Sequence, residues 1–527
     1  MQVPWAGMIA LAAATYFAWA IHSYCRSPLR KYSGPFLAGW TDVWRFYHTL
    51  RGDIHLVNRR THEKYGSVVR TGPNNLDLNL PALIKTIYSA DGKWRKTEFY
   101  PPASNVADGK VVPNLFSLLD PVEHVRQKRP VAKHYSLAGV LQLESHFDDA
   151  IRLLCHQLEE RFMTRDGDFG KGFDIGQWIK MLSPSYQHGL TLCLPDAWDV
   201  IGQITFSKRF GYLDKGRDFD GHLWLSEVGS DYLASISQLP YLDRWIDKNP
   251  ILPIGGATVL LGPTLRYVSD RHHGRDGDTH DDTKPDFLDK FIQAKTEHPD
   301  VVDDTQIISY LAINMLAGAD TTAISIKAVL YYVLRTPPAQ QQLEEEILAS
   351  DFVRQQSIPP AYDDIKVLPY LEAVVREAMR LHPGVAMTLP RVVPPGEGLV
   401  LPDGSVVPPG TSVGMNPYVV GRNRAVWGPK ADEFCPERWL RGRDESQEAY
   451  AERLQAMNSA DLTFGAGSRV CLGRHFGLVE VYKVVTSLFA LYEMEAIDPT
   501  KEWWVRNGFF LRQKGPEVRM RPRQRRQ

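Results

Sequence analysis

The sequence predicts a mainly helical protein with a few small β-sheets. Apolar residues recur at steps of three and four over residues 137–158 and 368–381, which is the period of an amphipathic helix. Short β-like runs such as 67–71 are scattered between these segments, and Asp403 with Gly404 predicts a tight hairpin turn. Because strands do not alternate regularly with helices, a parallel α/β sheet is not expected.

The composition argues against several other classes of protein. The 527 residues include 61 basic and 62 acidic side chains, for a net charge of −1, and 11% are aromatic. A disordered chain would have few aromatic residues, and a nucleic-acid-binding protein usually has a basic excess, so neither class is expected. The five cysteines form no CxxC pair, which leaves no zinc clip and favours a reducing compartment.

An uncharged N-terminal segment is predicted to cross a membrane. Residues 5–24 contain no charged side chain and would span about 30 Å as a helix, which matches the bilayer core. Arg26, Arg30 and Lys31 follow directly, and the positive-inside rule then leaves the rest of the chain in the cytosol. A cleaved signal peptide is disfavoured because no basic n-region precedes a long apolar run, and a buried N-terminal helix is the other alternative.

These features divide the chain into three parts. Residues 1–24 are expected to form the transmembrane anchor, and residues 25–40, with their Pro and Gly, a non-helical hinge. Residues 41–527 are expected to form a single large body.

A glycine-rich loop around Cys471 carries the strongest chemical signal. Residues 464–473 read FGAGSRVCLG, and an apolar-periodic helix is predicted over 474–491. The N–H groups and the dipole at a helix N-terminus stabilise a thiolate. The glycines allow the backbone to approach a flat ligand closely. We therefore interpret Cys471 as a ligand residue rather than as a small buried hydrophobe.

A long helix is predicted over residues 304–334, before Pro337 and Pro338. Its centre, 317–322, reads AGADTT and places an acid and two hydroxyls in an otherwise apolar helix. A glycine in a helix interior costs roughly 1 kcal/mol relative to alanine, so this composition calls for an explanation.

A helix of this composition could either cross a membrane or pass through the protein interior. A second membrane span would have to bury Asn314, Asp320 and Lys327 in lipid, which is costly. A helix that crosses the protein interior and lines a cavity fits better, because small residues make room and the polar groups can act there.

A third motif is weak by itself. Glu377 and Arg380 share one face of the helix predicted over 368–381, and such pairs are common on surfaces. In combination, however, 317–322, this Glu-x-x-Arg pair and 464–473 occur in an order that closely resembles the cytochrome P-450 haem-thiolate monooxygenases. The order of these motifs and the sequence around them are most similar to those of fungal enzymes of the pisatin demethylase-like group. The resemblance extends from the anchor to the C-terminus.

The resemblance implies the cytochrome P-450 fold, with haem b held between a long distal helix and the helix that follows the cysteine loop. It makes Cys471 the axial ligand of the haem iron, through a thiolate that donates electron density. Basic residues are implied to contact the haem propionates: Arg469, Arg391, His124 and Lys128. Loop residues are implied to frame the cofactor: Phe464, Gly465 and Gly473.

The resemblance also implies a catalytic pair and a structural cluster. Asp320 and Thr321 match the acid and alcohol that deliver protons during dioxygen reduction, although a hydroxyl bond from Thr321 to its own helix is the structural alternative. Glu377, Arg380 and Arg438 match a buried cluster that serves as scaffold.

Partners follow from the same resemblance. Electrons are expected from NADPH through the flavins of a separate NADPH–cytochrome reductase. The residues expected to form its basic docking face are Arg126, Arg129, Lys133 and Arg474. The expected location is the endoplasmic reticulum membrane, single-pass, with the catalytic domain cytosolic and no nucleic-acid partner.

The expected substrate is a lipophilic small molecule, hydroxylated, epoxidised or oxidatively dealkylated in fungal secondary metabolism. The segments expected to contact it are 101–116, 313–321, 385–388 and 509–510.

One segment departs from the family pattern. Residues 181–195, with Pro184, Gly189 and Pro195, interrupt an expected helix and read as a translated retained intron or an unusual surface loop. Two alternatives to the monooxygenase therefore stay open: a haem-thiolate isomerase or dehydratase, and an impaired, non-catalytic product of that insertion.

Overall fold

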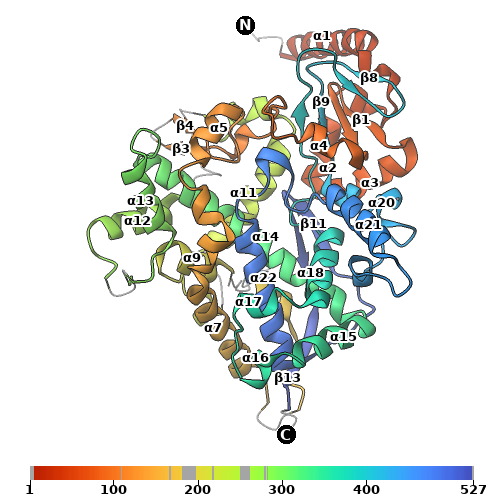
Figure 1. The fold of residues 1–527 in the computed structure, drawn as a ribbon. Helices are drawn as coiled ribbons and strands as arrows, with labels where there is room; N and C mark the ends of the chain where they lie inside the picture. The colour runs from red at the N-terminus through yellow and green to blue at the C-terminus, as the bar shows by residue number, and fades with distance from the viewer. Residues whose placement is uncertain are drawn as a thin grey trace.

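The computed structural model describes residues 5–107, 110–164, 168–180, 197–216, 219–249, 261–277, 280–281 and 283–524. Helices dominate this part of the chain and surround α14 (Asp304–Leu334), which runs through the centre of the molecule (Figure 1). Strands β1 (Val68–Gly72) and β9 (Ser412–Gly414) lie with the first four helices, within residues 5–87, on one side of α14. Helices α12 (Leu261–His272) and α13 (Phe287–Glu297) lie on the other side (Figure 1). The predicted mainly helical fold with small sheets is confirmed.

The helices of the N-terminal half are α1 (Trp5–Arg26), α2 (Val43–Arg51), α3 (Ile54–Tyr65), α4 (Ile84–Ile87), α5 (Pro121–Lys128), α6 (Leu137–Leu141), α7 (Glu144–Phe162), α8 (Ile175–Lys180), α9 (Ala197–Phe206), α10 (Tyr212–Lys215), α11 (His222–Ile236) and α12 (Leu261–His272). Those of the C-terminal half, besides α14, are α13 (Phe287–Glu297), α15 (Pro337–Leu348), α16 (Asp351–Arg354), α17 (Tyr362–Ile365), α18 (Pro369–Leu381), α19 (Pro417–Val420), α20 (Arg424–Trp427), α21 (Gln447–Ala460) and α22 (Arg474–Leu491).

The strands form five small sheets within the described chain. The largest has the order β1-β2-β9-β6, from β1 (Val68–Gly72), β2 (Asn75–Leu78), β9 (Ser412–Gly414) and β6 (Arg391–Val392). The second has the order β10-β13-β5, from β10 (Tyr492–Ala496), β13 (Glu517–Pro522) and β5 (Phe173–Asp174). Three hairpins complete the set: β3 (Asn105–Ala107) with β4 (Lys110–Val112), β7 (Leu399–Val400) with β8 (Val406–Val407), and β11 (Trp504–Gly508) with β12 (Phe510–Lys514).

The local predictions mostly match these elements. The predicted turn at Asp403 and Gly404 joins β7 to β8, and Gly404 takes a φ of +79° that suits glycine. The helix predicted over 137–158 is two helices, α6 and α7, separated by a break. Pro337 and Pro338 occupy the first turn of α15, where a missing N–H group costs no hydrogen bond.

The central helix is a core element and not a second span. By length and composition, the described helix that could cross a membrane is α14, but 61% of its apolar window is buried inside the protein. It packs against α9, α18 and α22, and the Asp303 side chain caps its first turn by accepting a hydrogen bond from the Gln306 N–H.

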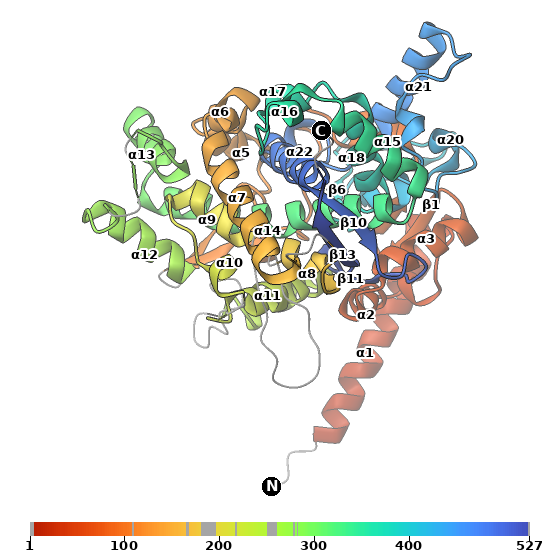
Figure 2. The same cartoon turned by 90° about the horizontal axis from the view of Figure 1, so that it is seen from below.

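The N-terminal helix α1 projects away from the body (Figure 2). Its Met8, Leu11 and Ile21 side chains are exposed. The following segment 25–40 was predicted as a non-helical hinge, but it contains two short 3-10 helices, Pro28–Lys31 and Leu37–Gly39. It is folded against the body, with Leu29 buried and Trp40 stacked on Tyr24 at a centroid distance of 4.4 Å. The unusual segment 181–195 lies outside the described residues, between α8 and α9.

Candidate functional site

A cavity of about 380 Å³ lies between the cysteine loop and α14. Cys471, Phe464, Gly465 and Gly473 line it on one side, and the 317–322 region of α14 lines it on the other. The structure therefore brings the two strongest sequence motifs to opposite walls of one space. This is the arrangement expected for a flat cofactor held between them.

Cys471 lines this cavity from a loop whose backbone conformation requires glycines. Gly465 and Gly467 take φ values of +71° and +65°, and a Cβ on Gly467 would lie 1.6 Å from the Tyr88 carbonyl oxygen. The Cys471 N–H donates to the Phe464 carbonyl at 2.8 Å, which closes the loop. The glycines are required by backbone conformation and close approach, as predicted.

The thiol of Cys471 opens onto the cavity but is surrounded by protein. Burial raises its pKa, while the Gly473 N–H and the Arg474 guanidinium act in the opposite direction. Gly473 directly precedes α22, so the predicted N-terminal placement is confirmed. A thiolate there needs a cationic partner in the cavity, and a metal ion supplies one.

Basic side chains gather along one edge of the cavity. Those that line it are Arg391, Arg469, Lys96, His124 and Lys128. None of them forms an ion pair with a carboxylate within the described chain; Lys96 donates instead to the Phe116 carbonyl at 2.6 Å, and Lys128 to the Ser468 carbonyl at 3.3 Å.

Without an anion nearby, the positive charges of these basic residues repel one another. Burial and the neighbouring Arg391 lower the pKa of Arg469 to about 10. Burial, followed by Arg469, Lys96 and Lys128, lowers the pKa of His124 to about 3. Burial and the Arg391 charge likewise hold the pKa of Lys96 well below its usual value. Two carboxylates, such as haem propionates, would relieve this repulsion, so the residues present fit haem.

Lys96 is a site residue that sequence analysis missed. It is 4% exposed, and its ammonium lies 4.1 Å from the centre of the Tyr100 ring. Tyr100 in turn accepts a hydrogen bond from Arg391 at 2.7 Å. No local pattern marks Lys96, because only tertiary packing brings it beside Arg391.

On the opposite wall, Thr321 and Asp320 have different environments. Thr321 lines the cavity, and its hydroxyl donates to the Ala317 carbonyl at 2.7 Å, which is the helix bond named above as the alternative. That bond uses the single donor of the hydroxyl and leaves its lone pairs able to accept. Asp320 lies behind the wall, 3% exposed, and its Oδ2 has no hydrogen-bond partner in the described structure.

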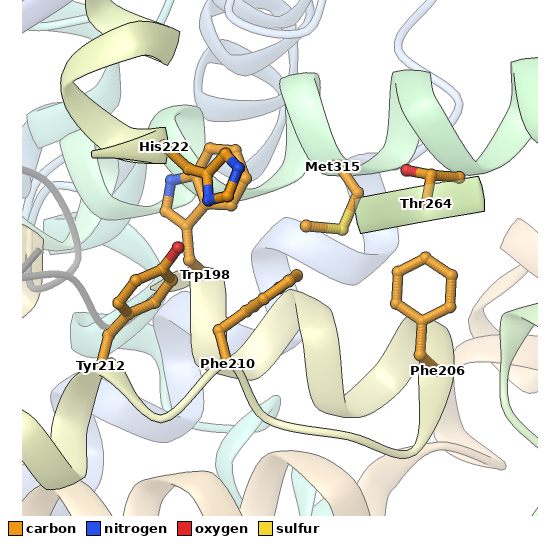
Figure 3. A pocket seen from close by; sticks show the side chains of 7 residues that line it. All are labelled: Trp198, Phe206, Phe210, Tyr212, His222, Thr264 and Met315. Atoms are coloured by element: carbon orange, nitrogen blue, oxygen red, sulfur yellow. The ribbon is translucent and has the colours of Figure 1, made fainter. Parts of the chain in front are cut away.

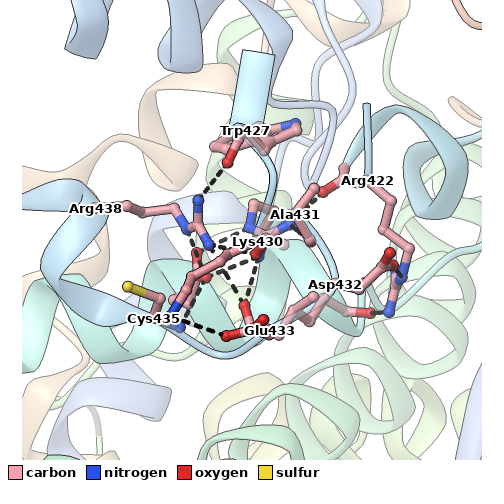
Figure 4. Close-up of polar contacts among 12 residues, drawn as sticks. Arg422, Trp427, Lys430, Ala431, Asp432, Glu433, Cys435 and Arg438 are labelled. Atoms are coloured by element: carbon pink, nitrogen blue, oxygen red, sulfur yellow. Dashed lines mark hydrogen bonds and ion pairs between the residues drawn. The ribbon is translucent and has the colours of Figure 1, made fainter. Parts of the chain in front are cut away.

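The predicted structural cluster is assembled and buried. Arg380 donates to Glu377 through two bonds of 2.8 and 2.7 Å, and Arg438 donates to it at 2.7 Å. The Arg438 guanidinium also donates to the carbonyls of Trp427 at 2.6 Å and Lys430 at 2.8 Å (Figure 4). The cluster ties α18 to the 427–438 segment, and none of its three residues lines the cavity.

The remaining cavity wall is mainly apolar. Residues from the segments predicted to contact substrate line it: Pro102, Ala103, Asn105, Leu115, Phe116, Ile313, Leu316, Val385, Phe509 and Phe510. Of residues 385–388, Val385 alone is among them. Sequence analysis missed α11, which contributes Ser226, Gly229 and Ser230. These small side chains leave room above the wall formed by α14.

A second, much smaller pocket lies between α9, α11, α12 and α14 (Figure 3). Aromatic rings, including Trp198, Phe206 and Phe210, surround a volume of about 10 Å³, which is space for a single water at most. It shares no lining residue with the large cavity and carries no candidate chemistry.

One group of possible metal ligands lies elsewhere. Ligand atoms of His280, Asp286 and Asp289 lie within 4.8 Å of one another. The Arg271 guanidinium already pairs with Asp286 at 2.7 Å and also with Asp289. An arginine therefore supplies the positive charge that a metal would bring.

Comparison with known proteins agrees with this geometry. Residues 37–520 match the family model described as Cytochrome P450. The chain belongs to the cytochrome P450 family. It is 42% identical to the cytochrome P450 monooxygenase cfoH of Aspergillus candidus, over 98% of this chain and 92% of that protein. It is 33% identical to cicH and 34% identical to pkfB, both cytochrome P450 monooxygenases of Emericella nidulans, over at least 91% of each chain.

Membership establishes the activity class and the cofactor. The chain is a haem-dependent monooxygenase of the P450 family, and the family's electron donor is usually a separate reductase. The narrower pisatin demethylase-like grouping stays a prediction.

Proposed function

We propose that this cytochrome P450 inserts one oxygen atom of dioxygen into a neutral, lipophilic small molecule of fungal secondary metabolism. The observation that carries the proposal is the apolar wall opposite Cys471, from Leu115 and Phe116 through Ile313 to Phe509 and Phe510. Such a wall favours apolar ligands, whereas a charged ligand would lose hydration without gaining a partner. Hydroxylation, epoxidation and oxidative dealkylation are all compatible with it.

When bound, haem would supply the iron chemistry that activates dioxygen, and Cys471 would hold that iron through its thiolate. Lys96, Arg391 and Arg469 would hold the haem propionates, with His124 and Lys128 at the same edge. Phe464, Gly465 and Gly473 shape the loop behind it. Glu377, Arg380 and Arg438 hold the segments that support this loop.

Thr321 and Asp320 are proposed to deliver protons. The Thr321 hydroxyl keeps its acceptor lone pairs free, so it can hold a water at the cavity wall. Asp320 is the next carboxylate along the helix and can recharge that water with a proton. The relatives, all monooxygenases, favour this oxygen-reducing role over an isomerase or dehydratase.

We further propose that α1 anchors the enzyme in the endoplasmic reticulum membrane with its catalytic body in the cytosol. The exposed apolar face of α1 and the basic residues that follow it support this placement. A version that begins after Arg26 should leave the membrane fraction, while a mitochondrial or secreted location of the full chain would contradict the proposal.

The reductase is proposed to dock on the surface that α5 shares with the start of α22. Arg129 and Arg474 are exposed there. Arg126 pairs with Glu123 at 2.8 Å, and Lys133 pairs with Glu297 at 2.7 Å, so these two charges are partly neutralised. Reversing Arg129 to Glu should weaken reductase-supported turnover more at low salt than at high salt. Peroxide-driven turnover should be spared, and equal losses in both assays would contradict this docking face.

The haem-thiolate assignment has a direct spectroscopic test. The reduced, carbon monoxide-bound holoenzyme should show the thiolate-type Soret band, and Cys471→Ala should lose it. Cys435→Ala is the matched control, because that thiol lies outside the cavity and should leave the band unchanged. A wild-type protein without the band would overturn the assignment and would favour a product impaired by residues 181–195.

Substrate class is tested by spectral titration of the resting holoenzyme. Neutral terpenoids, polyketides and alkaloid intermediates should shift the Soret band on binding, and anionic fatty acids should not. Ser230→Leu narrows the cavity beside α11 and should weaken binding of the larger ligands first. A preference for charged ligands would contradict the proposal.

A further inference from the structure

A lysine lies fully buried inside the central helix bundle. The Lys327 side chain, on α14, has no solvent exposure. Its ammonium donates one hydrogen bond, to the Gln513 carbonyl of β12 at 3.3 Å, and forms no ion pair in the described chain. An ammonium has three donors, so two are left for other groups. A buried charge with so little compensation is costly, and it persists where it serves a function.

Lys327 lies on the same side of α14 as Asp320. The two residues are seven positions apart, which is close to two helical turns, and lysine side chains on a helix lean toward its N-terminus. The ammonium is therefore directed along the helix toward Asp320, whose charge acts on it.

Two buried acceptors in this region have no hydrogen-bond partner in the described structure. Gln513 donates to the Ile324 carbonyl at 2.9 Å, while its side-chain oxygen has no partner, and neither has Asp320 Oδ2. Buried acceptors of this kind are usually satisfied by an internal water, which can also conduct a proton between groups that do not touch.

A second carboxylate, Asp174 of β5, also acts on Lys327. It is half-buried and accepts a hydrogen bond from the Gly515 N–H at 3.2 Å. The charges of Asp174 and Asp320 favour the ammonium form of Lys327, whereas the Arg512 guanidinium disfavours it, and Lys327 in turn disfavours the charged form of His382. Burial outweighs the rest and lowers the pKa of Lys327 to about 7. A base with this pKa both accepts and releases protons at neutral pH.

We propose that Lys327 relays protons to Asp320 from the solvent side at Asp174. This inference rests on the proposed role of Asp320 in proton delivery. The ammonium gives one proton, through an intervening water, to the Asp320 carboxylate, and the neutral amine then takes one from a hydronium ion of the solvent on the Asp174 side. The net transfer is one proton from solvent to Asp320, and no electrons move. Lys327 is a positioning residue, because it acts through Asp320 and is not part of the cavity wall.

The test measures how electrons from NADPH are used. The full-length holoenzyme is reconstituted with its reductase in phospholipid vesicles, and peroxide released per NADPH consumed is followed across pH. When protons reach the site too slowly, reduced dioxygen escapes as peroxide. The wild type should release little peroxide at neutral pH and severalfold more as Lys327 loses its proton. Lys327→Met should release the high amount at every pH. Superimposable curves would overturn the relay.

Two further variants separate a relay from the alternatives. Lys327→Arg keeps the positive charge but does not release a proton below about pH 12, so the relay predicts that it behaves like Lys327→Met. Wild-type behaviour in this variant would reduce Lys327 to a fixed charge and overturn the relay. If Asp320→Asn leaves peroxide release unchanged, the proposed proton delivery itself fails. If Asp320→Asn raises it and Lys327→Met does not, only the relay fails.

A readout without turnover checks the titration directly. Since folding lowers the pKa of Lys327, the folded protein must bury a charge below about pH 7, and this destabilisation fades as pH rises toward about 10, the unfolded pKa. The apparent melting temperature of Lys327→Met should exceed that of the wild type at about pH 6, by a margin that shrinks toward about pH 9. A margin independent of pH would also overturn the relay.

Discussion

Two parts of the molecule bury charged groups, and they treat them in opposite ways. Around Glu377, every buried charge is met: the carboxylate, fully buried, accepts from Arg380 and Arg438, from the Trp439 indole at 3.0 Å and from the Cys435 N–H at 3.1 Å. Around α14, Asp320 keeps an unpartnered oxygen and Lys327 a single long hydrogen bond.

The difference separates scaffold from chemistry. A fully satisfied buried network holds segments in one arrangement and has no capacity left for a ligand or a proton. An unsatisfied one costs stability, but its spare donors and acceptors can take up a water, a proton or a cofactor group. The cations beside the cavity, Lys96 and Arg469 among them, belong to the second kind. Haem propionates would give them the anion that the described chain does not supply.

The largest effect is expected from breaking the satisfied network. Glu377→Ala leaves two buried guanidinium groups without their carboxylate, a loss of about 3–5 kcal/mol, so holoenzyme should not accumulate. The measurement is the haem-to-protein absorbance ratio of the purified variant. Glu372→Ala is the control on the same helix: its side chain is 51% exposed and pairs with Arg376 at 3.4 Å, so about 0–1 kcal/mol is expected. Equal haem content in both variants would show that the cluster is not the scaffold.

Asp320→Asn should give the opposite combination of effects. The fold loses no ion pair, so haem content and the carbon monoxide Soret band should stay as in the wild type. Oxygenation of the best-binding lipophile should fall by about 100-fold or more, because a general acid is lost. Asp304→Asn, at the exposed start of the same helix, is the matched control and should keep full activity. Loss of haem from Asp320→Asn would instead place this residue with the scaffold.

The sequence was sufficient for what local patterns encode. Helix period placed 304–334 to the residue, and the glycines of 464–473 marked a backbone that Gly467 needs at its positive φ. These two features depend on neighbours in the chain, so short-range physics predicts them. The placement of Cys471 and Thr321 on one cavity was implied by the family resemblance and not by any local pattern.

What the sequence could not supply depends on tertiary packing. Lys96 joins Arg391 only because the segment before α5 folds over β6, and nothing near it in the chain distinguishes it from exposed Lys93. The prolines of segment 25–40 led to the prediction of a hinge, but the structure buries Leu29 of this segment in the body. The role of Lys327 was likewise invisible, because its partners Gln513 and Asp174 come from distant strands.

Lys96→Met should test the cavity cations with an intermediate effect. Without haem, removal of one charge relieves repulsion with Arg391 and Arg469, so the haem-free variant should melt at a higher temperature than the haem-free wild type. With haem, the variant has lost a propionate partner, so haem should transfer severalfold faster to excess apomyoglobin. Lys93→Met, at an exposed position, should change neither property. Unchanged haem transfer in Lys96→Met would remove this residue from the site.

The last effect is visible only as a pH dependence of stability and concerns a buried acid on α22. Glu480 forms no ion pair in the described chain, and burial raises its pKa to about 8. Since the unfolded pKa is about 4.3, the folded protein keeps a proton that the unfolded chain releases, and stability falls with rising pH between the two values by up to about 1.4 kcal/mol per pH unit. Glu480→Gln should remove this slope, so its advantage over wild type should grow from about pH 6 to about pH 8.

That trend opposes the one expected for Lys327, whose burial destabilises the protein less as pH rises. The two variants therefore report on two unpaired groups with opposite signs in the same melting experiment. If Glu480→Gln shows no pH dependence relative to wild type, the carboxylate is compensated after all, and Glu480 belongs with the satisfied network of Glu377.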